Sequence, residues 1–245
     1  MSSALHNDNT LSDRRTYTLR VVSLNVWNPG PDKIRRNEEL ATELRKIDPD
    51  VVLLQEMNNS RAQLELFSKG TGLQHRAWTE GVAIFCRFKL ENFAAPKVWR
   101  QPYCTPLNQL LDLRKAYFCC ATFQHEGVIH HVSAHHWDSR GITNRNRVSK
   151  EVSKRLSQLP STTAIICGGD FNARMDSQEV QQVFSGGNLT NSDPKKDSID
   201  YILYRGAVMR SPPVRKDFEK LTDHPMLISE LEFSIPGRAV GPALT

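Results

Sequence analysis

Residues 164–174, AIICGGDFNAR, join a short hydrophobic run to two glycines, a carboxylate and a carboxamide. The run 164–166 predicts a buried strand. Residues two apart in an extended chain project to the same side, so Asp170 and Asn172 would leave the strand end together. Functional sites of sheet proteins often gather at such ends. The alternative is a polar turn, in which Gly168 and Gly169 bend the chain and the two polar side chains bond to local backbone.

The composition is that of an ordinary globular protein. The chain has 245 residues, 39% hydrophobic and 24% charged, which argues against a disordered or fibrous protein. This length allows one large domain or two small ones, and no internal linker separates two halves. We therefore expect one folded domain over residues 17–235, with flexible tails at 1–16 and 236–245.

Composition also bounds the setting in which the protein works. No apolar run approaches the ~20 residues needed to cross a bilayer, and the first fifteen residues are polar, unlike a signal peptide. Five cysteines without CxxC spacing argue against a disulfide framework, so we expect an intracellular protein. The net charge of +5 suits a polyanionic substrate. Nothing indicates a protein partner, and we expect a monomer.

Hydrophobic periodicity predicts a strand–helix–strand unit at the start of the domain. Residues 19–27 are rich in β-formers and are followed by the turn signal Asn28-Pro29-Gly30. Residues 51–56 predict a second buried strand. Between them, residues 31–47 carry apolar side chains at helical spacing, namely Ile34, Leu40, Ala41, Leu44 and Ile47.

The rest of the chain predicts a mixed α/β fold with two packed sheets. The short turn 125–127 joins two strands into an antiparallel hairpin, and apolar positions Val148, Val152, Leu156 and Leu159 mark one face of a helix. Hairpins together with crossover helices indicate mixed sheets. The predicted strands are 81–87, 117–124, 128–136, 163–167, 199–204 and 226–233, with a short helix at 176–184.

Polar residues recur where these strands end. The set is Asn25, Glu56, the run from His135 to Asp138, Asp170, Asn172, Asp200, Asp223 and His224. Each has a structural explanation by itself, but burying so many uncompensated carboxylates together would be unfavourable. A divalent cation removes that cost. Oxygen ligands without cysteine favour Mg²⁺ or Mn²⁺ over zinc.

In this order, SLNVW, LLQE, HHWDSRG, GGDFNA, IDYIL and TDHP resemble the endonuclease/exonuclease/phosphatase superfamily. The motifs run from about Leu19 to Phe233. This superfamily includes deoxyribonuclease I, abasic-site endonucleases, neutral sphingomyelinases, inositol polyphosphate 5-phosphatases and tyrosyl-DNA phosphodiesterase. The resemblance implies a four-layer αββα sandwich with the active site at one edge of its two sheets.

The resemblance also implies a role for each polar residue. Glu56 resembles the principal metal ligand, assisted by Asn25 and Asp223. Asp170 resembles the group that orients or deprotonates the attacking water, with Asn172 beside it. His224 resembles the histidine that stabilises the transition state, and Asp200 resembles the carboxylate that orients this histidine and raises its pKa.

Two adjacent histidines compete for one further role. The superfamily places a histidine beside the phosphate, followed by an acid, a glycine and an arginine, and His136 fits this spacing with Asp138, Gly141 and Arg145. Neighbours on a strand point to opposite faces, so only one of the two can enter the site. We predict His136 in the site and His135 in a structural role.

Together these features predict a Mg²⁺- or Mn²⁺-dependent phosphodiesterase acting on nucleic acid or a nucleotide by in-line water attack, without a covalent intermediate. The alternatives are a phosphomonoesterase or small-molecule (inositol or lipid) phosphatase, and a catalytically idle binding module. SRG and GGDFNAR are similar to tyrosyl-DNA phosphodiesterase, but residues 188–200 lack the TWD motif of that branch. Residues 91–113 are either a substrate-side loop or a surface connection.

Overall fold

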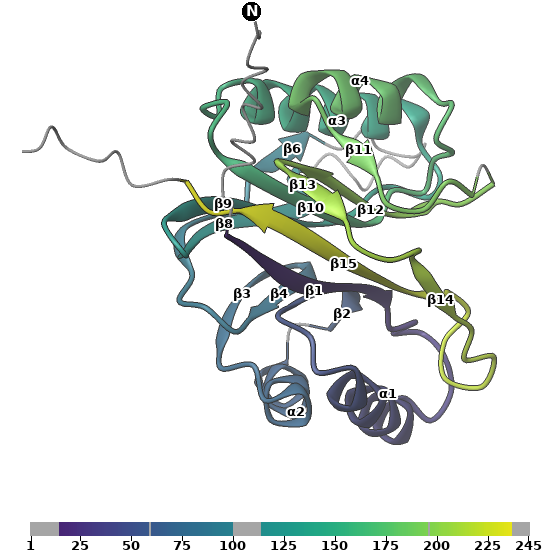
Figure 1. The fold of residues 1–245 in the computed structure, drawn as a ribbon. Helices are drawn as coiled ribbons and strands as arrows, with labels where there is room; N and C mark the ends of the chain where they lie inside the picture. Colours follow the sequence, from purple (N-terminus) through teal and green to yellow (C-terminus); the bar gives the residue numbers. More distant parts are fainter. Residues whose placement is uncertain (1–14, 59, 100–113, 196, 237–245) are drawn as a thin grey trace, which may run out of the picture.

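Four layers make up the part of the chain that the computed structural model describes, residues 15–58, 60–99, 114–195 and 197–236. Two β-sheets lie face to face with a pair of helices outside each (Figure 1). Helices α1 (Lys33–Ile47) and α2 (Arg61–Thr71) cover one sheet, and α3 (Ile142–Ser157) and α4 (Gln178–Gly187) cover the other. The predicted αββα sandwich is confirmed.

The first sheet joins the two ends of the domain. Its order is β13-β15-β1-β2-β4-β3, with β14 also paired to β15. Strands β1 and β2 are parallel and are connected through α1, which confirms the predicted strand–helix–strand unit. The strands are β1 (Thr16–Asn25), β2 (Val51–Met57), β3 (His75–Thr79), β4 (Gly81–Cys86), β13 (Ala207–Met209), β14 (Val214–Lys216) and β15 (Met226–Ser234).

The second sheet has the order β11-β12-β10-β9-β8-β5. Strands β8 and β9 form the predicted hairpin, β9 and β10 run parallel on either side of α3 in the chain, and β12 returns antiparallel to β10. The strands are β5 (Glu91–Ala94), β8 (Phe118–His125), β9 (Val128–His136), β10 (Ala164–Asp170), β11 (Thr190–Asn191) and β12 (Asp200–Arg205). A separate ribbon pairs β6 (Lys97–Trp99) with β7 (Arg114–Ala116).

Three apolar clusters fill the spaces between the four layers. The middle one, around Leu53 and Ile166, lies between the sheets. A second, around Leu40 and Phe67, packs α1 and α2 on the first sheet. The third, around Val152, packs α3 and α4 on the second sheet. Burial on both faces explains why the central strands are hydrophobic runs rather than alternating patterns, and it leaves strand ends as the places for polar side chains.

Helix α1 differs from its predicted inner face. Leu40, Ala41 and Leu44 are buried as expected, but Ile34 is 73% exposed, and Arg36 takes the buried position in that turn at 1% exposure. Hydrophobic spacing cannot detect this exchange, because the guanidinium of Arg36 is satisfied by carbonyls of two loops that are distant in the sequence.

The two glycines before Asp170 lie within a strand and do not turn the chain. Strand β10 continues through Gly168 and Gly169, so the prediction that the strand ends at residue 167 is wrong. A Cβ at Gly169, whose φ is 146°, would lie 2.0 Å from the carbonyl oxygen of His135 on β9. A Cβ at Gly168 would lie 2.8 Å from Leu53 Cδ1 of the facing sheet. The glycines therefore make room for the neighbouring strand and sheet and do not bend the chain as the polar-turn explanation required.

Four further features of the chain complete the comparison with the predictions. Helix α2 was missed, although Ser60 caps it by accepting a hydrogen bond from the Gln63 N–H. Of the five cysteines, the four that lie in described residues are free and buried. Within the described residues no helix is both long and apolar enough to span a bilayer. Residues 1–14, 100–113 and 237–245, which include most of both predicted tails and of the 91–113 segment, lie outside the described residues.

Candidate active site

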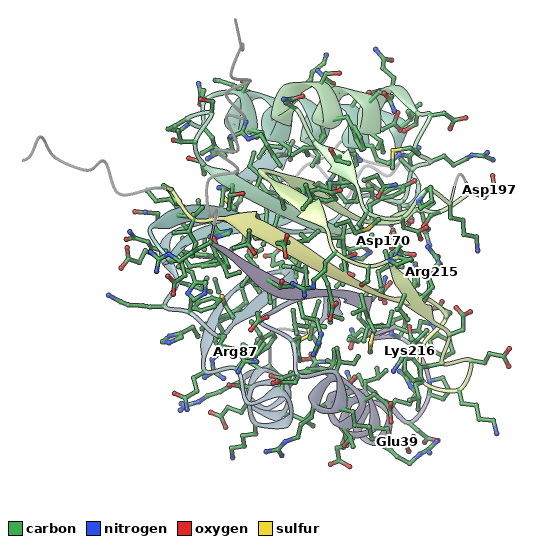
Figure 2. All side chains as sticks on the ribbon, viewed as in Figure 1. Glu39, Arg87, Asp170, Asp197, Arg215 and Lys216 are labelled. Carbon is green, nitrogen blue, oxygen red and sulfur yellow. The ribbon has the colours of Figure 1, made fainter. Side chains whose placement is uncertain are left out.

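Strand register brings the predicted residues to one edge of the sandwich. Asn25 ends β1, His136 ends β9 and Asp170 ends β10. Asp170 pairs with His136 on one side and with Asp200, the first residue of β12, on the other. Figure 2 shows Asp170 on the same side of the view as Arg215 of β14, with Arg87 toward the opposite side. The resulting cluster joins the ends of strands from both sheets.

Glu56 reaches the cluster through a β-bulge. The register between β2 and β4 shifts between Gln55 and Met57, and Glu56 adopts a left-handed backbone with a φ of 58°. This conformation is unfavourable for a residue with a side chain, and such strain is concentrated at functional sites. Its Oε2 accepts from the Asn28 N–H at 3.0 Å, and its side chain is 22% exposed. The bulge therefore directs a partly solvated carboxylate to the sheet edge.

Asn25 links the carboxylates of the two sheets. Its buried Nδ2 donates to Glu56 Oε1 and to Asp170 Oδ2, both at 3.2 Å. Its Oδ1 accepts from the Trp27 N–H at 2.9 Å. In this arrangement the amide bridges two negative groups and its oxygen is occupied by backbone. Asn25 therefore fixes the spacing between Glu56 and Asp170. Its prediction as a metal ligand did not include this bridging contact.

Asp170 and Asn172 form the local polar turn that was the alternative explanation of their motif. The Asn172 N–H donates to Asp170 Oδ1 at 2.8 Å, which is the local polar turn. Asn172 has a φ of 47°, so the chain is not extended there, and its Nδ2 donates to the Trp137 carbonyl oxygen at 3.0 Å. Asp170 is 2% exposed, and its second oxygen faces the cluster. The turn thus holds the Asp170 carboxylate in one orientation.

The environment of Asp170 opposes its ionisation. Burial, followed by the negative charge of Asp200, raises its pKa to about 7, and the opposing effects of His224, the Asn172 N–H and the Asn25 amide are smaller. A carboxyl group with a pKa near neutrality can accept a proton during a reaction. Burial and the charge of Asp200 therefore favour the protonated form of Asp170.

Asp200 and His224 form an ion pair beside it. His224 Nδ1 lies 3.1 Å from both carboxylate oxygens of Asp200, and its Nε2 lies 3.8 Å from Asp170 Oδ2. Burial disfavours the imidazolium, but the hydrogen bond and charge of Asp200, with smaller contributions from Asp170 and Asp223, raise the pKa of His224 to about 9. His224 is therefore cationic at neutral pH and directs a positive nitrogen at Asp170.

The two adjacent histidines separate as the strand geometry requires. His136 has a side chain 23% exposed, and its Nε2 lies 3.9 Å from Glu56 Oε1 and 3.8 Å from Asp170 Oδ2. His135 is fully buried and stacks between Phe118 and Phe171. The structure brings His136 into the cluster and leaves His135 in the core.

Asp223 is more exposed than the other predicted site residues. It is exposed, and within the described ranges it makes no hydrogen bond with Asn25 or Glu56. It acts on the cluster through its charge on His224. Among described histidines, cysteines and carboxylates, the group close enough to share one ion is Asp170, Asp200 and His224.

The structure adds contacts that we did not predict. Thr222 Oγ1 donates to the Asn25 carbonyl oxygen at 2.7 Å and accepts from the His224 N–H at 3.2 Å. The side-chain Oδ1 of Asn28, whose backbone N–H binds Glu56, is buried without a hydrogen-bond partner among the described residues. Their place in the TDHP and NVWN segments was the only sequence signal that could have identified them.

Comparison with known proteins agrees with the fold and the motif order. The family model of the Endonuclease/Exonuclease/phosphatase family matches residues 22–224, which include every predicted site residue. No curated protein matches the chain significantly.

Solved structures share the architecture at low identity. An endonuclease/exonuclease/phosphatase from Bacteroides vulgatus aligns with a TM-score of 0.70 at 13% identity, over 89% of this chain and 99% of that one. The human Nocturnin catalytic domain, solved with a bound sulfate anion, gives 0.69 at 18%, over 90% and 97%. Sphingomyelinase C from Streptomyces griseocarneus gives 0.62 at 16%, over 87% and 99%. At these identities the structures establish the fold alone.

Proposed function

Because the chain belongs to the endonuclease/exonuclease/phosphatase family, we propose that it is a divalent-metal-dependent phosphodiesterase acting on nucleic acid or a nucleotide. The observation that carries this proposal is the convergence of Glu56, Asp170 and Asp200 with His136 and His224 at one sheet edge. An acid cluster flanked by imidazoles suits hydrolysis of a phosphate ester, which requires charge neutralisation and an activated water.

The residues present fit a hard cation. The predicted ligands Glu56, Asn25 and Asp223 carry oxygen atoms, and the buried Asn28 Oδ1 has no hydrogen-bond partner among the described residues. These properties favour Mg²⁺ or Mn²⁺. Glu56 would hold the ion, assisted by Asn25 and Asp223. Such an ion supplies charge neutralisation and polarises a phosphoryl oxygen.

Asp170 is the proposed general base. Its Oδ1 is held by the Asn172 N–H, which leaves Oδ2 facing the imidazoles of His136 and His224. A water between this oxygen and a bound phosphate would lose its proton to Asp170 as it attacks. Because the Asn172 side chain is bound to the Trp137 carbonyl, Asn172 orients Asp170 in this mechanism.

The two imidazoles would stabilise the charge that develops on the phosphate. His224 is held by Asp200 and is cationic, so its Nε2–H can donate to a phosphoryl oxygen. His136 approaches from the second sheet's β9 with the more exposed ring. Hydrogen-bond donors fixed in advance at such positions commonly contribute more to catalysis of this type than any other single effect.

A panel assay with Mg²⁺ and with Mn²⁺ tests the proposal. The substrates are single-stranded and duplex DNA, RNA, 5′-tyrosyl DNA, sphingomyelin, inositol phosphates and bis-p-nitrophenyl phosphate. Metal-dependent cleavage of a nucleic acid supports the proposal, whereas cleavage of sphingomyelin or inositol phosphates alone would replace the substrate class. Inactivity throughout, with no metal binding in calorimetry, would identify a binding module.

A further inference from the structure

Arg36 of α1 is a buried cation that the proposed chemistry does not use. It is 1% exposed, although arginine is rarely so deeply buried without a carboxylate partner. Its guanidinium donates to four backbone carbonyl oxygens, those of Val26, Trp27, Pro31 and Leu221. Burial lowers the pKa of Arg36, while the charges of Asp223 and Asp32 act in the opposite direction.

These carbonyls belong to two segments that carry site residues. Val26, Trp27 and Pro31 lie in residues 26–32, directly after Asn25, and Leu221 lies in residues 217–225, which contain His224. The Nη1 nitrogen alone joins the two segments, donating to the Val26 carbonyl oxygen at 3.2 Å and also to that of Leu221.

Thr222 forms a second link at the same junction. Its Oγ1 donates to the Asn25 carbonyl oxygen and accepts from the His224 N–H, so the residue after Leu221 ties the end of β1 to His224. Two adjacent residues thus fix the position of the His224 backbone, one through Arg36 and one through its own hydroxyl.

The chemistry of arginine explains why this position is not hydrophobic. An apolar side chain would leave four carbonyls without these donors, whereas the planar fork of a guanidinium satisfies acceptors in several directions at once. The Arg36 Cζ also lies 4.9 Å over the Trp27 ring, and a Cβ at Gly30 would come within 2.6 Å of that ring. The guanidinium is therefore held by the face of the Trp27 ring as well as by the hydrogen bonds of its nitrogens.

We propose that Arg36 is a positioning residue, which holds residues 221–224 against the end of β1 so that His224 stays aligned with Asp170 and Asp200. This inference rests on the proposed function for its effect on turnover. Displacement of a group in an active site by about 1 Å can cost on the order of 10²-fold in rate.

Arg205 supplies a matched control at the opposite end of the second sheet. It also donates to backbone carbonyls, those of Pro160, Thr163 and Gly187, and burial also lowers its pKa. It ends β12, whereas Asp200 at the site begins that strand. A change at Arg205 removes the same kind of contact without touching either segment of the site.

The experiment compares Arg36→Lys with Arg205→Lys in the full chain. Lysine keeps the charge but cannot reach all four carbonyls. At a temperature where both variants are folded, Arg36→Lys should lower kcat on bis-p-nitrophenyl phosphate on the order of 10- to 100-fold, with KM little changed. Arg205→Lys should lower Tm but keep kcat within about twofold. Equal kcat losses in the two variants would overturn the inference.

Hydrogen exchange provides a readout that does not depend on activity. Residues 217–225 should exchange faster in Arg36→Lys than in Arg205→Lys or the wild type, and unchanged exchange would overturn the inference. If Arg36→Lys fails to fold, Gly30→Ala is used instead, because its Cβ would press on the Trp27 ring and on Arg36 Nη2 while the guanidinium is retained. Faster exchange of residues 217–225 in Gly30→Ala would support the inference, and unchanged exchange would overturn it. Should the wild type hydrolyse nothing, the proposed function fails, while exchange still tests whether Arg36 holds residues 221–224.

Discussion

His135 and His224 are both withdrawn from water, and their pKa values shift in opposite directions. His135 contacts neutral groups, Ser133, Cys167 and the Trp137 indole, and burial lowers its pKa to about 3. His224 faces Asp200 and Asp170, and these carboxylates raise its pKa to about 9 despite burial. Burial alone therefore does not determine the charge of a histidine here. The core keeps its histidines neutral, and the site keeps a histidine charged by surrounding it with carboxylates.

The largest expected effect follows from removing the carboxylate that both site histidines approach. Asp170→Asn should lower kcat by about 10³-fold or more, because the amide cannot accept the proton of the attacking water. Its Tm should stay near that of the wild type, since a buried carboxylate at neutral pH is itself unfavourable. Steady-state kinetics measures kcat, and thermal unfolding measures Tm. Activity within tenfold of the wild type would remove Asp170 from the mechanism.

A smaller effect separates the two adjacent histidines. His136→Ala should lower kcat on the order of 10²-fold with little change in Tm, because a donor near the phosphate is lost from a partly exposed position. His135→Ala should instead lower Tm, because it leaves a cavity between two phenylalanines and removes the acceptor for the Trp137 indole. If His135→Ala showed the greater loss of kcat in folded protein, the two roles would be exchanged.

Acid should destabilise the core, because the core histidines are neutral in the folded protein. His224 is already protonated at neutral pH, so its charge does not change as the pH falls. His130, His131 and His135 have pKa values lowered by burial to about 3, 4 and 3. At these three positions the unfolded chain therefore binds more protons below pH 6.5, and their contribution to stability falls as the pH falls. For His135 alone the loss at pH 5 is about 2 kcal/mol, or about 30-fold in the unfolding constant.

Urea unfolding of the metal-free protein at pH 7.5, 6 and 5 measures this effect. His135→Gln retains an acceptor for the Trp137 indole but does not titrate in this range. It should therefore lose less stability than the wild type between pH 7.5 and 5, by about 2 kcal/mol. The same pH dependence in variant and wild type would show that His135 is protonated in the folded core.

Much of the fold and the placement of most candidate site residues at strand ends were predictable because they depend on local patterns. Hydrophobic runs located the central strands, and the polar residues at their ends gave Glu56, His136, Asp170 and His224. The family resemblance placed these residues around one edge, where Asp223 is exposed. The alternation of side chains along a strand also assigned His135 and His136 to opposite faces, because this alternation does not depend on the partner strands.

The remaining features depend on contacts between distant segments. The bulge that directs Glu56 into the site is set by the pairing of β2 with β4, and residues 51–57 alone do not encode it. The burial of Arg36 in place of Ile34 depends on a carbonyl 185 residues away. Gly169 was assigned to a turn because the close approach of β9, which requires a glycine there, is visible only in the assembled sheet.

Removing the partner charge of His224 tests most directly why its pKa is raised whereas that of His135 is lowered. In metal-free Asp200→Asn, burial continues to oppose the imidazolium while its main stabilising partner is gone, so the pKa of His224 should fall by more than one unit, over about tenfold in proton affinity. Asp223→Asn is the matched control, and its effect should be smaller because Asp223 is exposed and screened by solvent. NMR titration of the imidazole protons measures both. A pKa that stays near 9 in Asp200→Asn, or that falls equally in both variants, would mean that a diffuse field of carboxylates rather than one bonded partner keeps His224 charged.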